Sequence, residues 1–336
     1  MTQELAHLRL DAPLDVFGSG DFGGDRLALA SSLSPTDLST ETIGELPFNL
    51  HDMLLGREIG TTLKTARIRK FRAGGREFWW LREEDSLDEL SKQVDLPGHR
   101  IVFPDEEIER NVISAIEHIA SRPWAMALLG TYVSAFALTE AVSAEAEKRL
   151  ITSCSLPDFP LCVFFSGRAQ IHIPPLTISL RPSVRLLAEN LYHEAVHQAV
   201  NYQLLSNEIL VPSYSSATSP KIPIYWREEA GEQRNRAWEL DRVLHAAAVY
   251  CHLLAWRYQE LLDPRLPAED RETITSASAD AVGATRALCE ALTTHIRYFT
   301  SEGAMLVGRL IEAGQMRSAV LSTVLGLTSK PLEVMH

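Results

Sequence analysis

The chain has 336 residues, of which 46% are hydrophobic and 23% are charged, so it holds enough apolar material for a sizeable core. This composition excludes a disordered chain and a collagen-like repeat. The formal net charge is −12 at pH 7, and because an acidic surface repels phosphate, we expect no general affinity for nucleic acid.

Residues 1–104 are predicted to form an N-terminal region whose first sixty residues alternate short helices with loops. Gly74-Gly75 separates two aromatic-rich runs, 68–71 and 78–81, which predicts a β-hairpin. This hairpin is either a solvated basic face or a docking site for an acidic precursor peptide, and stacking of single-stranded nucleic acid on its aromatic rings is a further alternative. Its basic residues are Lys64, Arg67, Arg69, Lys70, Arg72 and Arg76.

From residue 105 onward the chain has a mostly helical pattern. Apolar residues recur at three- and four-residue steps over residues 108–119, which predicts an amphipathic helix that ends before Pro123. Residues 124–149 are predicted to form a second, more buried helix. Two short apolar runs within residues 162–173 flank a Ser-Gly-Arg sequence and predict a second hairpin.

A long helix is predicted over residues 183–205, with Ser183 as its N-cap. A loop rich in Pro, Ser and Thr follows at residues 211–223. Further helices are predicted at residues 232–262, 269–298 and 305–325. We therefore expect a mainly α fold of the α+β type with one or two small β-hairpins, in which the N-terminal region is followed by a helical domain, residues 105–336.

The helix over residues 183–205 contains an H-E-x-x-H motif. Residues four apart project from one face of a helix, so His193 and His197 can bind one metal ion together. Glu194 lies beside that face, where it can act on a metal-bound water or orient a ligand. Because the helix is otherwise apolar, the two histidines need partners. Metal binding is the main hypothesis, and two hydrogen-bonded core histidines are the alternative.

A third metal ligand has to come from another part of the chain. His245 is the first choice, because the small residues after it allow a close approach of helices. Asp241 lies one turn earlier on the same face and is the second choice, either as a ligand or as a carboxylate that holds the imidazole. Glu239 is the third choice, and a surface charge is its alternative interpretation.

This motif and its surroundings resemble the HExxH-type peptide-modification proteins that are encoded beside ribosomally made, post-translationally modified peptides (RiPPs). The resemblance covers roughly residues 105–265, whereas residues 226–229 depart from the Pro-rich stretch that the family pattern has there. The sequences that carry it are residues 153–166, Leu191-Tyr192-His193-Glu194-Ala195-Val196-His197, Tyr225-Trp226-Arg227 and Leu244-His245-Ala246.

The resemblance implies an iron(II)- and 2-oxoglutarate-dependent oxygenase in RiPP biosynthesis. Such an enzyme hydroxylates a side-chain carbon of a precursor peptide, and the β-carbon of an Asp-like residue is the expected position. His193, His197 and His245 would hold the iron, although two histidines and one carboxylate are the more usual set. Arg227 would pair with the far carboxylate of 2-oxoglutarate, and Glu194 would orient other groups. An ion pair of Arg227 with a neighbouring glutamate is the structural alternative.

Two other hypotheses use the same histidines. Imidazole binds zinc as well as iron, so a zinc metallopeptidase with Glu194 as general base is the alternative function. The extended zinc-protease motif, with a third histidine soon after His197, is absent. The remaining hypothesis is a protein without catalytic activity, in which a metal ion only links two helices.

The sequence also bears on localisation. The longest uncharged stretch, residues 123–139, is shorter than the roughly 20 apolar residues that span a bilayer. Charged residues near the N-terminus interrupt the apolar run that a signal peptide requires. The four cysteines form no C-x-x-C pair, which is typical of reduced thiols. We therefore expect a cytoplasmic protein with no membrane partner.

Overall fold

The computed structural model describes residues 42–47, 63–83, 96, 98–147, 151–156, 159–229 and 236–327. These residues group into two compact units. The first, here called the sheet unit, contains the described residues of 42–173 and 178–207. The second, the helical unit, contains those of 174–177 and 208–327. The domain boundary predicted after residue 104 stays a prediction.

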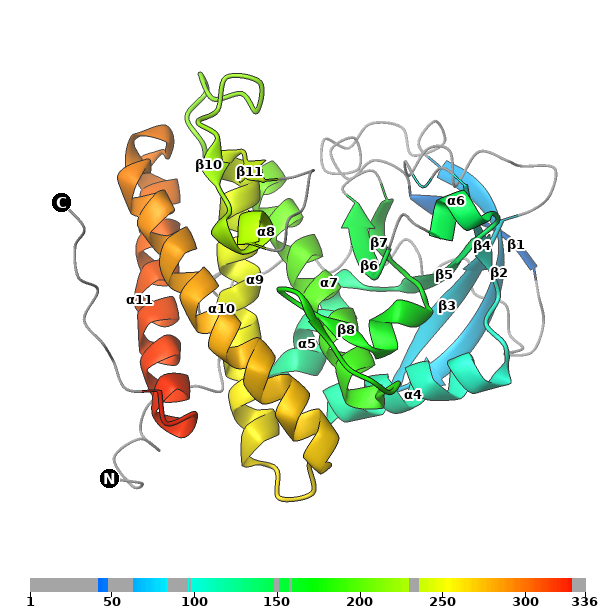
Figure 1. Ribbon diagram of the computed structural model, residues 1–336. Helices are drawn as coiled ribbons and strands as arrows, with labels where there is room; N and C mark the ends of the chain where they lie inside the picture. Colours follow the sequence, from blue (N-terminus) through cyan, green and yellow to red (C-terminus); the bar gives the residue numbers. More distant parts are fainter. Residues whose placement is uncertain are drawn as a thin grey trace. The chain divides into compact units, whose positions relative to one another are not determined.

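Seven strands of the sheet unit form one mixed sheet (Figure 1). They are β1 (Thr42–Pro47), β2 (Leu63–Ala73), β3 (Arg76–Arg82), β4 (His99–Val102), β5 (Ala135–Ala141), β6 (Ser153–Leu156) and β7 (Phe159–Phe165). The order is β1-β2-β3-β5-β7-β6, and β4 pairs with the second half of β5. β5 runs parallel to β3 and to β7, whereas the other pairs are antiparallel. Parallel neighbours require crossover connections, which the intervening helices supply.

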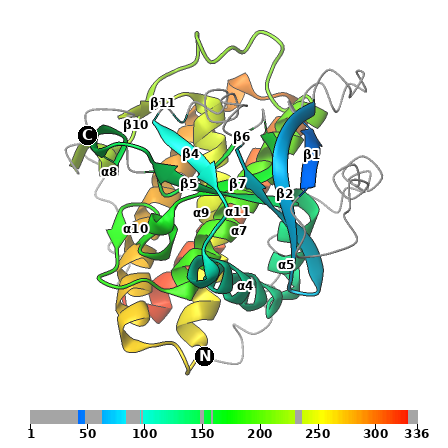
Figure 2. The same ribbon diagram turned by 90° about the vertical axis from the view of Figure 1, so that its right-hand side faces the viewer.

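The predicted hairpin of β2 and β3 is confirmed. Gly74 and Gly75 have φ angles of +56° and +72°, a region that glycine adopts without steric cost. The register pairs Phe71 with Phe78, so the aromatic side chains face each other across the two strands. β1 runs alongside the first part of β2 (Figure 2).

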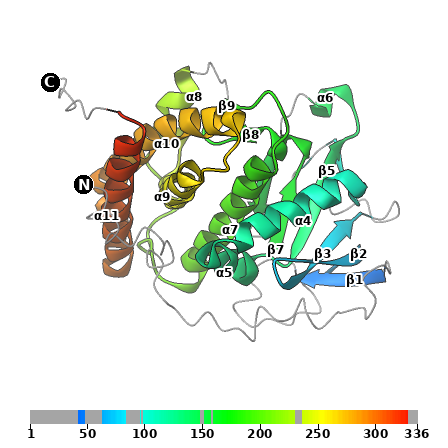
Figure 3. The ribbon, with the colours of Figure 1, turned by 90° about the horizontal axis from the view of Figure 1, so that it is seen from below.

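Three helices pack against one another and against this sheet (Figure 3). They are α4 (Glu106–Ala120), α5 (Pro123–Tyr132) and α7 (Val184–Ser206). Trp80 shows how they are held: its ring stacks on Phe71 at a centroid distance of 4.7 Å, and its indole N–H donates to Glu109 of α4 at 3.1 Å. Phe78, Phe136 and Phe165 are also buried, so large aromatic rings form part of this core.

Short elements complete the sheet unit and the junctions of the chain. They are α6 (Ala144–Glu147), the 3₁₀ turn η5 (Gly167–Gln170), β8 (His172–Ile173) and β9 (Thr177–Ile178).

Three long helices make up most of the helical unit, with α10 packed against both others (Figure 1). They are α9 (Leu240–Leu262), α10 (Ala268–Thr294) and α11 (Ser301–Val324). A Cβ atom added at Gly314 of α11 would lie 3.0 Å from Thr285 of α10, so a small residue allows this close approach. The short elements here are β10 (Ile222–Pro223), α8 (Tyr225–Glu229), β11 (Ala237–Trp238) and η6 (Ile296–Tyr298).

Three predictions of secondary structure are wrong. Residues 42–47 form strand β1, where short helices and loops are predicted, and the rest of residues 1–60 lies outside the described residues. The helix predicted over residues 124–149 is interrupted, because α5 ends at Tyr132 and strand β5 follows. The first five residues of β5 are all buried, so the strand lacks the alternation that would distinguish it from a buried helix. The second hairpin is also absent: β7 pairs with β5 and β6, and residues 167–170 form η5.

The predicted fold class is therefore confirmed only in part. The helices predicted near residues 108–119 and 183–205 are present, as are three long C-terminal helices, although α9 begins at Leu240 rather than at residue 232. Instead of one or two small hairpins, however, the protein has a seven-stranded mixed sheet, and the fold is mixed α/β. None of the helices in the described ranges combines the length and the apolar character that crossing a membrane would require.

Candidate metal centre

The two motif histidines lie together on a half-buried face of α7 in the sheet unit. The Nε2 atoms of His193 and His197 are 2.9 Å apart, and the ring centroids are 4.8 Å apart. At this distance one ring donates a hydrogen bond to the other. Two imidazole nitrogens bound at right angles to one ion, each at about 2.1 Å, lie about 3.0 Å apart. The observed pair therefore has the spacing of two neighbouring ligands of one metal ion.

Two buried amide side chains, one before and one after the histidine pair, fix the position of α7. Asn190 donates to the carbonyl oxygens of Ala169 at 2.9 Å and His172 at 2.7 Å. About two turns further on, Gln198 donates to the carbonyl oxygen of Cys162 at 3.1 Å. Buried polar groups are costly unless they are paired, so these bonds favour one rotation of the helix. That rotation leaves the two histidines on the partly exposed side.

Glu194 has a different environment from its neighbours. Only 2% of its surface is exposed, and its Oε1 accepts a hydrogen bond from the Ser153 hydroxyl of β6 at 2.7 Å. Burial raises the pKa of the Glu194 carboxyl to about 7, and the hydroxyls of Ser153 and Ser155 offset part of this shift. A carboxyl with a pKa near 7 can both give and take a proton at neutral pH.

The first choice for the third ligand, His245, lies in α9 of the helical unit. Burial lowers the pKa of its imidazole to about 4, so the ring is neutral at pH 7, the form that binds metals. Taken separately, neither unit brings three or more described His, Cys, Asp or Glu side chains into an arrangement that could hold a metal ion. A centre that joins His245 to His193 and His197 therefore stays a prediction.

The other two ligand candidates have partners in the helical unit. Asp241 accepts hydrogen bonds from the hydroxyls of Tyr214 at 2.8 Å and Ser216 at 3.0 Å. Glu239 forms an ion pair with Lys221. Both carboxylates thus hold the loop over residues 211–223 against the start of α9.

Arg227 lies in α8, where its guanidinium carbon is 5.6 Å from the centroid of the Trp238 ring. A second guanidinium, that of Arg242, lies 4.8 Å from the same centroid. Neither Arg242 nor Trp238 is predicted from the sequence as a site residue. Their only signal is a spacing of four residues across the start of α9, which is too common to identify a site.

Several basic side chains of the hairpin have partners within the sheet unit. Its ion pairs are Arg69–Glu109, Lys70–Glu77 and Arg72–Glu77, and Arg76 donates to the carbonyl oxygen of Gly130. β1 pairs with residues 63–68 of β2, so this part of the hairpin edge is already occupied. The side chain of Lys64 lies outside the described residues. Docking of a precursor peptide here stays a prediction.

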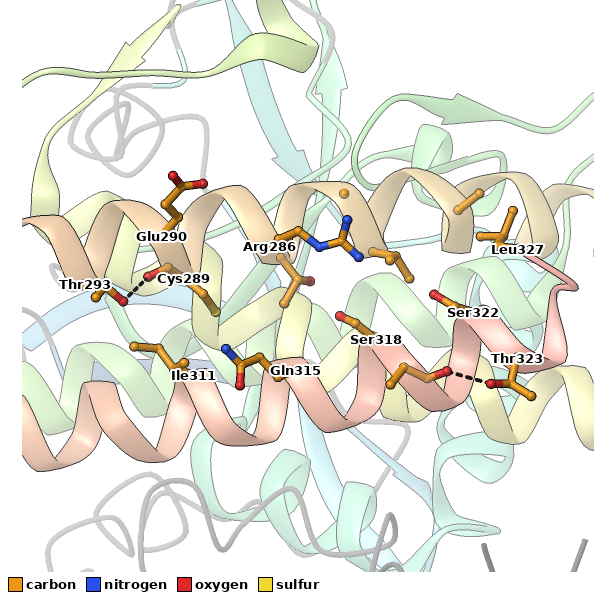
Figure 4. A pocket seen from close by; sticks show the side chains of 16 residues that line it. Arg286, Cys289, Glu290, Thr293, Ile311, Gln315, Ser318, Ser322, Thr323 and Leu327 are labelled. Atoms are coloured by element: carbon orange, nitrogen blue, oxygen red, sulfur yellow. Dashed lines mark hydrogen bonds between the residues drawn. The ribbon is translucent and has the colours of Figure 1, made fainter. Parts of the chain in front are cut away.

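A separate groove of about 740 Å³ lies between α10 and α11 in the helical unit (Figure 4). Figure 4 shows Arg286, Gln315 and Ser318 near its centre and Glu290 toward one end. Its walls carry no pair of histidines or carboxylates, since Glu290 is the only acidic residue among the lining residues. The groove is therefore not a candidate metal site.

Comparisons with known proteins add no relative. A scan against models of protein families finds none that matches this chain, and a search of curated proteins finds no match either.

Proposed function

We propose that this protein is an iron(II)- and 2-oxoglutarate-dependent oxygenase that hydroxylates a side-chain carbon of a ribosomally made precursor peptide. The observation that carries the proposal is the 2.9 Å separation of the Nε2 atoms of His193 and His197 on a half-buried helix face. The resemblance of the motif and its surroundings to HExxH-type peptide-modification proteins supplies the reaction type.

Each residue of the proposed site has a defined task. His193, His197 and His245 would bind iron, and three protein ligands leave positions open for a co-substrate and O₂. Iron and 2-oxoglutarate, when bound, supply the activation of O₂. Arg227 would bind and orient the far carboxylate of the co-substrate through a forked, charge-assisted pair. Glu194 accepts a hydrogen bond from Ser153 and would orient the groups that bind beside it.

His245 is preferred as the third ligand for a reason within the helical unit. The carboxylates of Asp241 and Glu239 hold the loop over residues 211–223, so ligation by either would break contacts that fasten this loop. Burial keeps the imidazole of His245 neutral at pH 7, which is the form that binds a metal ion.

The first test is spectroscopic and needs no peptide. We expect the protein, loaded anaerobically with Fe(II), to develop a visible charge-transfer band when 2-oxoglutarate is added, because the co-substrate chelates the metal. His197→Ala should abolish the band, whereas His295→Ala, which removes a histidine outside the proposed ligand set, should retain it. If the wild-type protein gives no band, the oxygenase proposal is wrong.

The zinc metallopeptidase remains the second candidate, and the buried Glu194 beside the two histidines is the observation that favours it. It predicts that the Zn(II)-loaded protein cleaves fluorescein-labelled casein, that Glu194→Gln removes cleavage, and that 2-oxoglutarate has no effect. Cleavage with these properties would replace the oxygenase proposal.

A further inference from the structure

We propose that the groove between α10 and α11 binds a small organic molecule that carries one carboxylate on an apolar body. This site belongs to the helical unit alone, and it is independent of the metal centre and of the proposed function.

The groove has the dimensions of a small-molecule site. Its volume is about 740 Å³, within the range of about 300–1,000 Å³ that is common for ligand pockets. Short side chains, such as those of Ala279 and Ala319, line part of it and leave room between the helices. Arg286 and Gln315 line the groove and are exposed, so a ligand can reach it from solvent.

The observation that points to a ligand is a buried hydroxyl that has no partner. Ser318 lines the groove with only 7% of its surface exposed, and within the described part of the chain its Oγ forms no hydrogen bond. In Figure 4 this hydroxyl points into the groove, toward the side on which Arg286 lies. A helical serine can instead donate to the preceding turn, as Ser278 does to the carbonyl oxygen of Ile274 at 2.6 Å. Buried polar groups are rarely left unsatisfied, so an acceptor bound in the groove would explain the orientation of Ser318.

The groove also carries a cation that no carboxylate neutralises. Among the described residues, Arg286 has no ion pair and no hydrogen bond. Glu290 lies one turn further along α10, but Figure 4 shows the side chain of Arg286 extending away from it, along the groove toward Ser322 and Leu327. The guanidinium of Arg286 is therefore free to bind an anion.

A second cation of α11 adds positive charge beside the groove. Arg317, the residue before Ser318, is 3% exposed, and its guanidinium donates to the carbonyl oxygen of Cys251 at 3.0 Å. No carboxylate of the described ranges pairs with Arg317. Because a buried charge is screened less than one in water, it favours an anion over a cation in the neighbouring groove.

The free donors match one carboxylate. A guanidinium presents two parallel N–H groups that fit the two oxygens of a carboxylate, and the Ser318 hydroxyl can donate to one of the remaining lone pairs. A doubly charged phosphate is less well matched, because Arg286 is the only cation among the described lining residues and Glu290 is a carboxylate.

The rest of the groove favours an apolar body. The hydroxyls of three lining threonines are already used, because Thr285, Thr293 and Thr323 donate to backbone carbonyl oxygens of their own helices at 2.7, 2.8 and 2.9 Å. Val282 and Ile311 add apolar surface. A ligand that extends from Arg286 along the groove therefore meets few further donors.

The test is isothermal titration calorimetry of the metal-free full chain with sodium octanoate, which carries one carboxylate on a linear hydrocarbon chain. We expect saturable binding at one site per chain. Octylammonium, which reverses the charge, and acetate, which lacks the chain, should each bind at least about tenfold more weakly. Equally tight binding of either probe overturns the proposed ligand class.

Two variants of exposed arginines locate the site. Arg286→Gln should weaken octanoate binding about tenfold or more, because it removes the charge-assisted pair. Arg265→Gln removes an exposed charge that does not line the groove, and it should leave the affinity within about twofold. An unchanged affinity in Arg286→Gln overturns the proposal, as does the absence of saturable binding to the wild-type protein.

Ser318→Ala distinguishes a hydroxyl that binds a ligand from one that stabilises the fold. Because this hydroxyl has no partner among the described residues, its removal should leave the Tm of the ligand-free protein unchanged or higher. The affinity for octanoate should fall about threefold or more. A lower Tm together with an unchanged affinity would mean that the hydroxyl acts within the fold, and the proposal would then be wrong.

Discussion

The four cysteines lie in environments that keep their thiols protonated. Burial raises the pKa of Cys154 and of Cys289 to about 12 from the usual 9, and it also raises the pKa of Cys162 and of Cys251. The thiolate is the reactive form, so the reactive fraction of Cys154 or Cys289 near pH 8 falls about 1,000-fold. We expect iodoacetamide to modify the native protein slowly at all four positions and the protein in guanidinium chloride rapidly, as measured by mass spectrometry. Rapid modification of native Cys289 would contradict this.

Residues of the candidate site differ in how far the sequence could predict them. The shared helix face of His193 and His197 follows from a spacing of four, because one helical turn contains 3.6 residues, and the structure confirms it. The bond between Glu194 and Ser153 joins positions 41 apart. The cation–π contact of Arg227 with Trp238 joins α8 to β11, whereas that of Arg242 with Trp238 spans four residues, a spacing too common to mark a site. These contacts therefore could not be predicted from the sequence.

In helix α11, we expect replacement of glycine by alanine to have opposite effects on stability at positions 303 and 308. A Cβ atom at Gly303 would overlap the carbonyl oxygen of Ile209, whereas one at Gly308 would meet nothing within 4 Å. We expect Gly303→Ala to lower the free energy of unfolding by about 2 kcal/mol, since the backbone has to shift. Gly308→Ala should raise it by roughly 0.5–1 kcal/mol, because alanine loses less entropy in a helix. Urea denaturation measures both, and equal effects of the two changes would contradict the packing at Gly303.

Helices and strands can be predicted from the sequence when one of their faces is polar and the other is apolar, and they are hard to predict when both faces are buried. α4 has a polar and an apolar face and an Asp105 side chain that caps Ile108, so its pattern predicts the helix. The hairpin of β2 and β3 is predictable because two glycines at positive φ mark its turn. The first five residues of β5 are buried, and β7 lies between β5 and β6 in the sheet, so their apolar runs do not distinguish strand from helix. Long-range pairing decides their structure.

At the scale of the whole molecule, the proposed metal ligands can be tested by measuring thermal stability with and without metal. His193 and His197 belong to the sheet unit and His245 to the helical unit, so a metal bound by all three requires both units to be folded. A ligand that binds only the folded state at about 100 times its Kd stabilises it by about 2.7 kcal/mol. We therefore expect Zn(II), compared with a chelator, to raise the Tm of the wild-type protein by several degrees.

The variants then show which residue supplies the third ligand. Each variant is compared with itself in Zn(II) and in chelator, so any change in its basal stability cancels. His193→Ala should remove the rise in Tm, because it breaks the pair on α7. His245→Ala should reduce the rise to a similar degree if this imidazole completes the centre, whereas Asp241→Asn should retain it. A full rise in His245→Ala together with none in His193→Ala would show that His245 is not a ligand, and the three-histidine centre would then be wrong.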